Sequence, residues 1–195
     1  MVGNPRSACS PSEEAAGMGA SKKGLIRTPP GHGGGGVRFR TLEDLQSEGW
    51  AMPVLRYLAD TNSVSDFFRS GNPVKEWFAA HPGEIGISTL TLAEMRRGIE
   101  LREHGRARRR LERAYQFILE DYHGAIFVFD EAAAMEWGRL MLEARNHPLP
   151  YDDSLIGAIA QSCGLKVLTR NQKHFPGNAT IDPWTGVEHG AWQPR

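Results

Sequence analysis

The chain has 195 residues, and its 23 Lys and Arg residues balance 23 Asp and Glu residues, so its formal net charge is +0. This length predicts one domain plus an appendage, and the balanced charge does not indicate a protein that binds nucleic acid through its overall charge. Two cysteines are too few for a disulfide framework or a zinc site, so we expect a protein of the reducing cytoplasm. No apolar run approaches the roughly 18 residues of a membrane span, and the N-terminus lacks the apolar core of a secretory signal.

The first 51 residues differ in composition from the rest of the chain. Gly, Pro, Ser and Ala dominate residues 1–36, and Gly33–Gly36 is an uninterrupted glycine run. Such a stretch cannot bury enough apolar surface to offset its ordering entropy, so we expect residues 1–51 to form a disordered extension. Residues 37–51 are ambiguous, because Leu42, Leu45 and Trp50 could form a short helix after an N-cap at Thr41. We expect order to begin near Met52 and residues 52–195 to form one domain. Translation that starts at Met52 is one hypothesis for the extension, and a genuine disordered tail is the alternative.

Apolar periodicity and turn residues predict alternating strands and helices after Met52. The expected strands are Val54–Ala59, Ile85–Ile87, Ala125–Phe129, Lys166–Thr169 and, as a fifth, Ala179–Ile181. The expected helical segments are Val64–Arg69, Val74–Ala80, Thr91–Leu101, Gly105–Tyr122, a helix from Asp130 to about Arg145, and Asp153–Cys163. Strands separated by helices require crossover connections, so the pattern predicts an α/β fold with a parallel sheet covered on both faces.

Four acidic or amide side chains lie close to the ends of these apolar runs. Asp60 follows the first strand, Glu94 lies in the helix after the second, Asp153 opens the last helix, and Asn171 follows the strand that comes after that helix. Carboxylates at the carboxyl ends of parallel strands converge on the crevice where open α/β sheets bind ligands. Hard oxygen ligands of this kind favour Mg²⁺ or Mn²⁺, and these ions in turn favour phosphate substrates.

Each of these residues also has a local explanation. Asp60 can cap the helix that follows it, and either Asp152 or Asp153 can cap the last helix. Glu94 can interact favourably with a helix dipole, or pair with a neighbouring arginine, and Asn171 can be an ordinary turn residue. Capping alone does not explain the combination. One acid or amide stands after the first strand, one after the second, one before the last helix and one after the last core strand.

The chain from about Met52 to Trp184 resembles a PIN-domain ribonuclease of the VapC/FitB toxin type. The matching stretches occur in the family's order over almost the whole domain. They are Tyr57-Leu-Ala-Asp-Thr-Asn62, Ile87-Ser-Thr-Leu-Thr-Leu-Ala-Glu94 with Arg97-Gly98-Ile99, Phe127-Val-Phe-Asp-Glu131, Asp153-Ser-Leu-Ile-Gly-Ala-Ile-Ala160, and Val167-Leu-Thr-Arg-Asn171 with Phe175.

The resemblance implies a PIN-domain α/β/α sandwich with a central parallel sheet of four to five strands. It implies a Mg²⁺ or Mn²⁺ site made by Asp60, Glu94 and Asp153, with Asn171 close by. It also implies hydrolysis of RNA, a homodimer, and inhibition by a cognate antitoxin.

Within that site we assign Asp60 and Asp153 as direct metal ligands. Glu94 is either a ligand, directly or through water, or the group that orients the nucleophile. The supporting positions, which contact substrate or hold the ligands in place, are Asn62, Thr169 and Asn171. One departure concerns His174, because many relatives carry an acid at that position. A chain without that acid is expected to bind metal more weakly, or to rely on water and Asn171.

Local positive charge indicates where RNA would bind. The arginines in question are Arg96, Arg97, Arg102, Arg106, Arg108, Arg109, Arg110 and Arg113. Such a cluster suits a phosphate backbone, but it also fits a solvated helix face with interleaved glutamates, or a docking surface for the antitoxin.

Two other classes of protein are alternatives to a metal-dependent ribonuclease. The first is a catalytically weakened PIN module that mainly binds its antitoxin or RNA, and His174 is the feature in its favour. The second is a nucleotide-binding α/β domain, which we set aside because Gly31–Gly36 follows no strand and precedes no helix.

Overall fold

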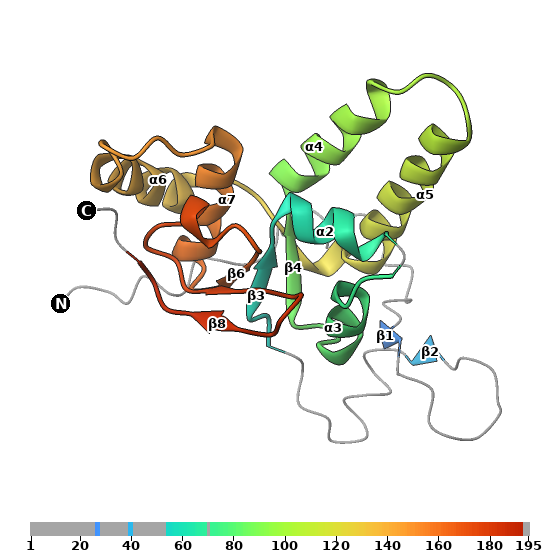
Figure 1. Cartoon of the computed structure of the whole chain (residues 1–195), viewed down its shortest axis with the longest axis horizontal. Helices are drawn as coiled ribbons and strands as arrows, with labels where there is room; N and C mark the ends of the chain where they lie inside the picture. The colour runs from blue at the N-terminus through green and yellow to red at the C-terminus, as the bar shows by residue number, and fades with distance from the viewer. Residues whose placement is uncertain (1–25, 28–38, 41–53, 70, 193–195) are drawn as a thin grey trace.

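The computed structural model describes residues 26–27, 39–40, 54–69 and 71–192 (Figure 1). Ahead of Val54, the described residues form two short strands, β1 (Ile26–Arg27) and β2 (Phe39–Arg40), which pair antiparallel. Met52 lies outside the described residues. The division into an extension and a domain, and the start of translation at Met52, therefore stay predictions.

The expected alternation of strands and helices is present, with ends that differ by a few residues. The helices are α2 (Thr61–Phe67), α3 (Val74–Ala80), α4 (Thr89–Glu100), α5 (Arg106–Asp121), α6 (Glu131–Glu143) and α7 (Tyr151–Ser162), with 3-10 helices η3 (His123–Ala125) and η4 (Gln172–His174). The strands are β3 (Tyr57–Ala59), β4 (Ile85–Ser88), β5 (Ile126–Phe127), β6 (Lys166–Leu168), β7 (Thr180–Ile181) and β8 (Glu188–His189). None of the helices in the described part of the chain is long and apolar enough to cross a membrane.

The main sheet has six strands in the order β5-β4-β3-β6-β7-β8. All neighbours pair in parallel except β7 and β8, which are antiparallel. The expected α/β class with a central parallel sheet of four to five strands is confirmed, since five strands pair in parallel, and the antiparallel sixth strand was not expected. The missed strand, β8, consists of the polar residues Glu188 and His189 at the sheet edge, so it carries none of the apolar pattern by which a buried strand is recognised.

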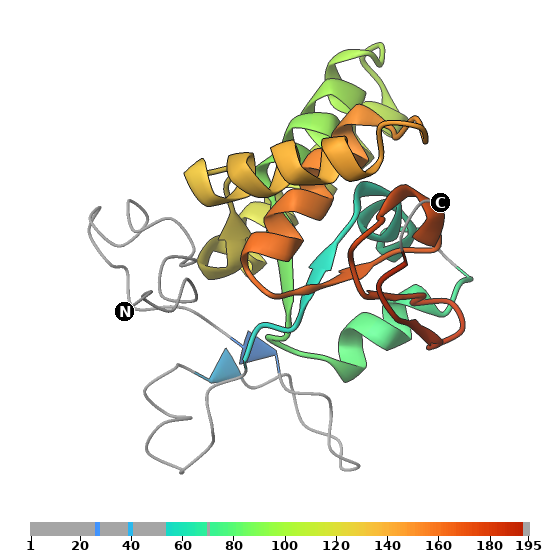
Figure 2. The same ribbon diagram turned by 90° about the vertical axis from the view of Figure 1, so that its left-hand side faces the viewer.

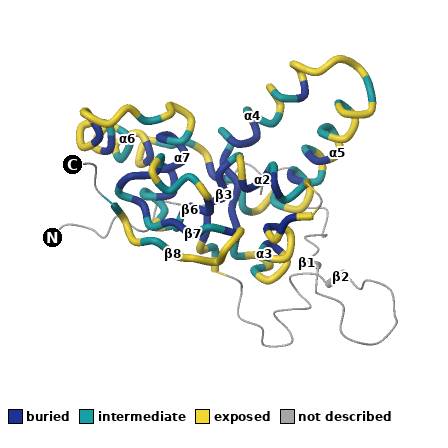
Figure 3. Tube along the Cα trace, viewed as in Figure 1, coloured by how far each residue is buried: buried dark blue, intermediate teal, exposed yellow. Residues whose placement is uncertain are grey.

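Helices cover both faces of the sheet, as Figure 2 shows. Successive side chains of a strand point to opposite faces, and those of the central strand β3 pack in two separate clusters. Tyr57 and Ala59 pack in one buried cluster with apolar residues of α2, α3, α4 and α5, whereas Leu58 packs in a second cluster with residues of α6 and α7. The central strands are almost entirely buried (Figure 3). The α/β/α sandwich is therefore confirmed.

Strand β4 passes close to its neighbour β5 at a glycine. A Cβ atom at Gly86 would overlap the ring of Phe127 and lie 3.2 Å from the carbonyl oxygen of Ala125. Glycine at this position therefore allows Phe127 to fill the core beside β4, and this packing places the carboxyl end of β4 against the rest of the sheet.

Candidate active site

The polar residues expected to converge lie at one edge of the sheet. Asp60 follows β3, the strand that pairs in parallel with both β4 and β6. Glu94 lies on α4, which begins directly after β4, and Asn171 follows β6. Asp153 lies in the first turn of α7. Parallel strands end at the same edge, so the chain brings these groups to the carboxyl end of the sheet, where open α/β folds bind ligands.

The carboxylate of Asp60 is buried and held in one orientation, with only 1% of the residue exposed. Its Oδ1 atom accepts from the backbone N–H of Ser63 at 2.6 Å, and its Oδ2 atom accepts from the hydroxyl of Thr169 at 2.6 Å. Burial raises the pKa of Asp60, and the hydrogen bonds from Thr169 and Ser63 partly offset that effect. The capping role considered for Asp60 is real, since the bond to Ser63 caps α2. This capping bond uses only the Oδ1 atom of the Asp60 carboxylate.

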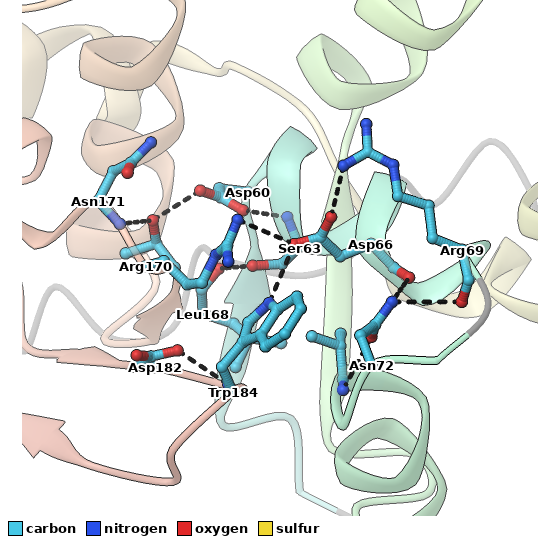
Figure 4. Close-up of polar contacts among 12 residues, drawn as sticks. Asp60, Ser63, Asp66, Arg69, Asn72, Leu168, Arg170, Asn171, Asp182 and Trp184 are labelled. Atoms are coloured by element: carbon cyan, nitrogen blue, oxygen red, sulfur yellow. Dashed lines mark hydrogen bonds and ion pairs between the residues drawn. The ribbon is translucent and has the colours of Figure 1, made fainter.

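Thr169 and Ser63 together tie the segment after β3 to the end of β6. Figure 4 shows Ser63 beside Asp60 and Leu168. The Thr169 hydroxyl also accepts from the backbone N–H of Asn171 at 2.9 Å, and the Ser63 hydroxyl donates to the carbonyl oxygen of Leu168 at 2.8 Å. Asn62, by contrast, is exposed. It was one candidate for holding the Asp60 carboxylate, but Ser63 and Thr169 make those contacts. A role for Asn62 in contacting substrate stays a prediction.

Glu94 is half-buried and lacks the cationic partner suggested for it. The hydroxyl of Thr61 donates to one carboxylate oxygen of Glu94. The neighbouring Arg96 instead pairs with Glu100 one turn further along α4. The pKa of Glu94 is raised, first by burial and then by the negative charges of Asp152 and Asp153. The site therefore has an excess of negative charge around Glu94.

Asp153 is partly buried, whereas the neighbouring Asp152 is exposed. The prediction that one of these acids caps α7 was wrong, because the cap is Pro150 and no side chain caps the helix. The Oδ2 atom of Asp153 lies 2.7 Å from Nδ1 of His174. Burial raises the pKa of Asp153, whereas His174 acts in the opposite direction. Sequence reasoning singled out His174 by its position three residues after Asn171, but did not place it against Asp153.

The comparisons with known proteins assign this arrangement to a family. The sequence model of the PIN-domain family matches residues 57–177, which is more than half of the chain. The chain belongs to the PIN-domain family. Toxin FitB of Neisseria gonorrhoeae is 32% identical over 135 residues, which cover 65% of this chain and 97% of FitB. The tRNA(fMet)-specific endonuclease VapC of Shigella flexneri is 27% identical over 140 residues, covering 68% of this chain and all of that protein. The resemblance to the VapC/FitB toxins is thus confirmed.

Solved structures support the same assignment. The crystal structure of FitAcB from Neisseria gonorrhoeae has a TM-score of 0.60 at 31% identity, covering 66% of this chain and 98% of that chain. The structure of FitAB bound to a DNA fragment has a TM-score of 0.62 at 31% identity, covering 68% and 98%. The PIN domain described above is therefore similar to toxins in sequence as well as in fold.

The chemistry of the acidic cluster fits a divalent cation. The pKa values of Asp60, Glu94 and Asp153 are all raised, because each carboxylate is removed from water and the acids repel one another. A cation bound among these oxygens would relieve both effects. As they stand, no three Asp, Glu, His or Cys side chains in the described part of this PIN domain are close enough together to hold a metal. Binding would thus require side chains to rotate, and Glu94, held through one oxygen, and Asp153, held by His174, are placed to do so.

A cavity of about 660 Å³ opens beside the acids, between α2, α4 and α5 of the PIN domain. Thr61 and Glu94 line it, so the cavity reaches the acidic cluster. Its remaining lining is partly apolar and partly basic: Ser65, Phe68, Arg69, Met95, Gly98, Arg102, Arg106, Ala107, Arg110, Leu111 and Ala114. Two arginines of the cluster noted in the sequence, Arg96 and Arg108, form ion pairs with glutamates, as the solvated-face alternative expects.

Proposed function

We propose that this PIN domain is a Mg²⁺- or Mn²⁺-dependent endoribonuclease that acts in the cytoplasm as the toxin of a toxin–antitoxin pair. The observation that carries the proposal is the convergence of Asp60, Glu94 and Asp153 from three separate elements on one edge of the sheet, each with a raised pKa. Buried acids of like charge destabilise a fold, so their presence together suits a site whose function needs them.

Asp60, Glu94 and Asp153 would hold the cation. When bound, a divalent cation at such a site stabilises charge on the transferring phosphate and lowers the pKa of a water molecule. Asp60 is already oriented by Ser63 and Thr169 and would keep the geometry of the site constant. Glu94 accepts one hydrogen bond, from Thr61, and its half-exposed carboxylate is placed to accept a proton from, or to orient, an attacking water.

The cavity beside Glu94 supports a protein partner. Its apolar residues Phe68, Met95 and Leu111 suit an amphipathic segment, and Arg102 and Arg106 suit acidic side chains of that segment. The solved relatives include a toxin–antitoxin complex from Klebsiella pneumoniae, 26% identical with a TM-score of 0.53. We propose that a segment of the cognate antitoxin occupies this cavity, and that the toxin itself is a homodimer.

One feature favours a second candidate function, a catalytically weakened PIN module that binds antitoxin or RNA. His174 takes the place at which many relatives carry an acid, and its imidazole engages an oxygen of Asp153. A module of this kind would bind RNA without cleaving it.

Incubation of RNA with the purified full chain and with its Asp60→Asn variant separates the two functions. The nuclease proposal predicts cleavage by the wild type with Mg²⁺ or Mn²⁺, none with EDTA, and none by the variant. Binding without cleavage by the wild type would favour the weakened module, and equal cleavage by both proteins would contradict the assigned site.

A further inference from the structure

A second buried acid lies on α2, six residues beyond Asp60, and it is not part of the acidic cluster. Asp66 is only 3% exposed. Arg69 places a guanidinium nitrogen 2.8 Å from Oδ1, and Arg170 places one 3.4 Å from Oδ2. The indole N–H of Trp184 donates to Oδ2 at 3.0 Å. Asp66 thus joins three segments of the chain: the end of α2, the loop after β6, and the turn between β7 and β8 (Figure 4).

The groups around Asp66 form a preorganised surface. The guanidinium carbon of Arg170 lies 4.5 Å from the centre of the Trp184 ring, over its face. The backbone N–H of Trp184 donates to the Asp182 side chain at 2.8 Å, which orders the turn. A cation over the face of an indole is an attractive arrangement, and the bond to Asp66 sets the plane of the ring. Arg170 and Trp184 are therefore held in position before any ligand arrives.

These groups are also accessible to a ligand. The side chains of Arg69 and Arg170 are 69% and 47% exposed, and Trp184 is 36% exposed. Two guanidinium groups face the single carboxylate of Asp66, and the Asp182 carboxylate on the same surface contacts the backbone of Trp184 rather than either arginine. Arg170 has five N–H donors and makes a single long contact with Asp66, so most of its donors remain available to a ligand.

This surface adjoins the acidic cluster through two of the three chain segments that build it. Arg170 directly follows Thr169, whose hydroxyl donates to Asp60. Asp66 lies on the same short helix as Ser63, whose N–H also donates to Asp60. A strand of RNA whose phosphate lies at Asp60 would therefore have neighbouring nucleotides within reach of Arg170.

We propose that Arg170 and Trp184 form a subsite for one nucleotide of single-stranded RNA next to the phosphate that is cleaved. The guanidinium of Arg170 binds the phosphodiester of that nucleotide, and the base stacks on the face of the Trp184 indole that Arg170 does not cover. Asp66 is a positioning residue that holds both side chains. The location of the cleaved phosphate rests on the proposed function, but the binding of RNA by these two side chains does not.

Single-stranded RNA fits this surface because of its two kinds of recognition group. Arginine binds phosphate oxygens through its planar fork, which lysine lacks. A base in a single strand offers an unstacked face to an aromatic side chain, and such stacking tolerates any base sequence. In a duplex the bases are stacked on one another, so a duplex would contact Arg170 but gain nothing from Trp184.

The test is the affinity of the full chain for a fluorescein-labelled single-stranded RNA, measured by anisotropy in EDTA so that cleavage does not intervene. We expect Trp184→Ala to weaken binding on the order of ten-fold, and Trp184→Phe to retain most of the affinity because the stacking face is kept. We expect Arg170→Gln to weaken binding by roughly ten-fold and to reduce the slope of log affinity against log salt by about 0.7, the value for one phosphate contact on a single strand. Arg170→Lys should keep the slope but not the full affinity.

The control for charge is Arg145→Gln, at an exposed arginine just after the end of α6, which should change neither affinity nor salt slope. Thermal unfolding of each variant establishes that it is folded. A duplex of the same sequence should bind Trp184→Ala as well as wild type. Wild-type affinity in both Arg170→Gln and Trp184→Ala, or no saturable binding by the wild type, would overturn the subsite. RNA binding that depends on Arg170 and Trp184 without any cleavage in Mg²⁺ would leave the subsite standing and refute the nuclease.

Discussion

His174 on η4 and Asp153 on α7 are 21 residues apart in sequence, yet the Nδ1 atom of His174 lies 2.7 Å from the Oδ2 atom of Asp153. The imidazole therefore occupies an oxygen that the proposed cation needs. An ionised carboxylate only accepts hydrogen bonds, so the contact with ionised Asp153 requires the proton on Nδ1. The ring restricts how Asp153 can turn toward a cation, so the identity of residue 174 should tune how tightly the site binds metal.

The first prediction follows from that contact. His174→Asp replaces a nitrogen base by a carboxylate, which suits Mg²⁺ better, so we expect Mg²⁺ to bind on the order of ten-fold more tightly than to wild type. Isothermal titration calorimetry measures this affinity directly. His174→Asn is the matched control, because it removes the imidazole without adding charge. An Asp variant that binds Mg²⁺ no better than the Asn variant would contradict the role assigned to position 174.

The second prediction concerns Thr169, whose hydroxyl donates to Asp60 and accepts from the backbone N–H of Asn171. Thr169→Val keeps the shape but removes both bonds, so we expect the free energy of unfolding to fall by about 1–3 kcal/mol. Urea denaturation measures this change. Thr169→Ser retains the hydroxyl and should recover most of the loss. Equal stability of the Val and Ser variants would show that the hydroxyl contributes little to holding Asp60.

The elements of the fold could largely be predicted from the sequence, because apolar periodicity reports burial. Periodicity does not predict a strand that is hardly buried, such as β8. Capping rules also fail at α7, because this helix begins after Pro150 without a side chain that caps it. The positions of Asp60, Glu94 and Asp153 could also be predicted, because topology alone brings strand ends together.

The partners of those acids could not be predicted, because they depend on side-chain directions. Ser63 rather than Asn62 reaches Asp60, although both follow it closely in the chain. The contact between Asp66 and Trp184 joins residues 118 positions apart, and neither residue belongs to a recognisable motif. A buried acid inside a short helix is a sequence signal for such a contact, but it does not name the partner.

The third prediction concerns the pH dependence of stability at Glu94. Its pKa is raised above the ordinary value of 4.5, so the folded protein holds this proton more tightly than the unfolded chain does. The resulting stabilisation is fully present below about pH 4.5 and is lost as the pH rises through the folded-state pKa. Glu94→Gln avoids this loss, so without metal we expect it to be more stable than wild type at pH 7.5, by less than about 1 kcal/mol because the half-exposed group is screened by solvent.

Urea denaturation of wild type and Glu94→Gln at pH 7.5 and pH 4.5 tests this expectation. The advantage of the variant should shrink at the lower pH, and saturating Mg²⁺ at pH 7.5 should reverse the order by stabilising only the wild type. Glu103→Gln, at an exposed position in the loop after α4, should show neither effect. A variant that is less stable than wild type at pH 7.5 without metal would contradict the excess of negative charge inferred around Glu94.

The central claim is that Asp60, Glu94 and Asp153 act as one cation site. Calorimetric titration of Mn²⁺ tests it most directly, with the wild type and the three variants Asp60→Asn, Glu94→Gln and Asp153→Asn. We predict saturable binding by the wild type and a large loss of affinity in each variant, while Glu103→Gln binds as the wild type does. Unchanged Mn²⁺ affinity in the folded Asp60→Asn variant would contradict the account, because Asp60 is the acid that the surrounding hydrogen bonds hold most firmly.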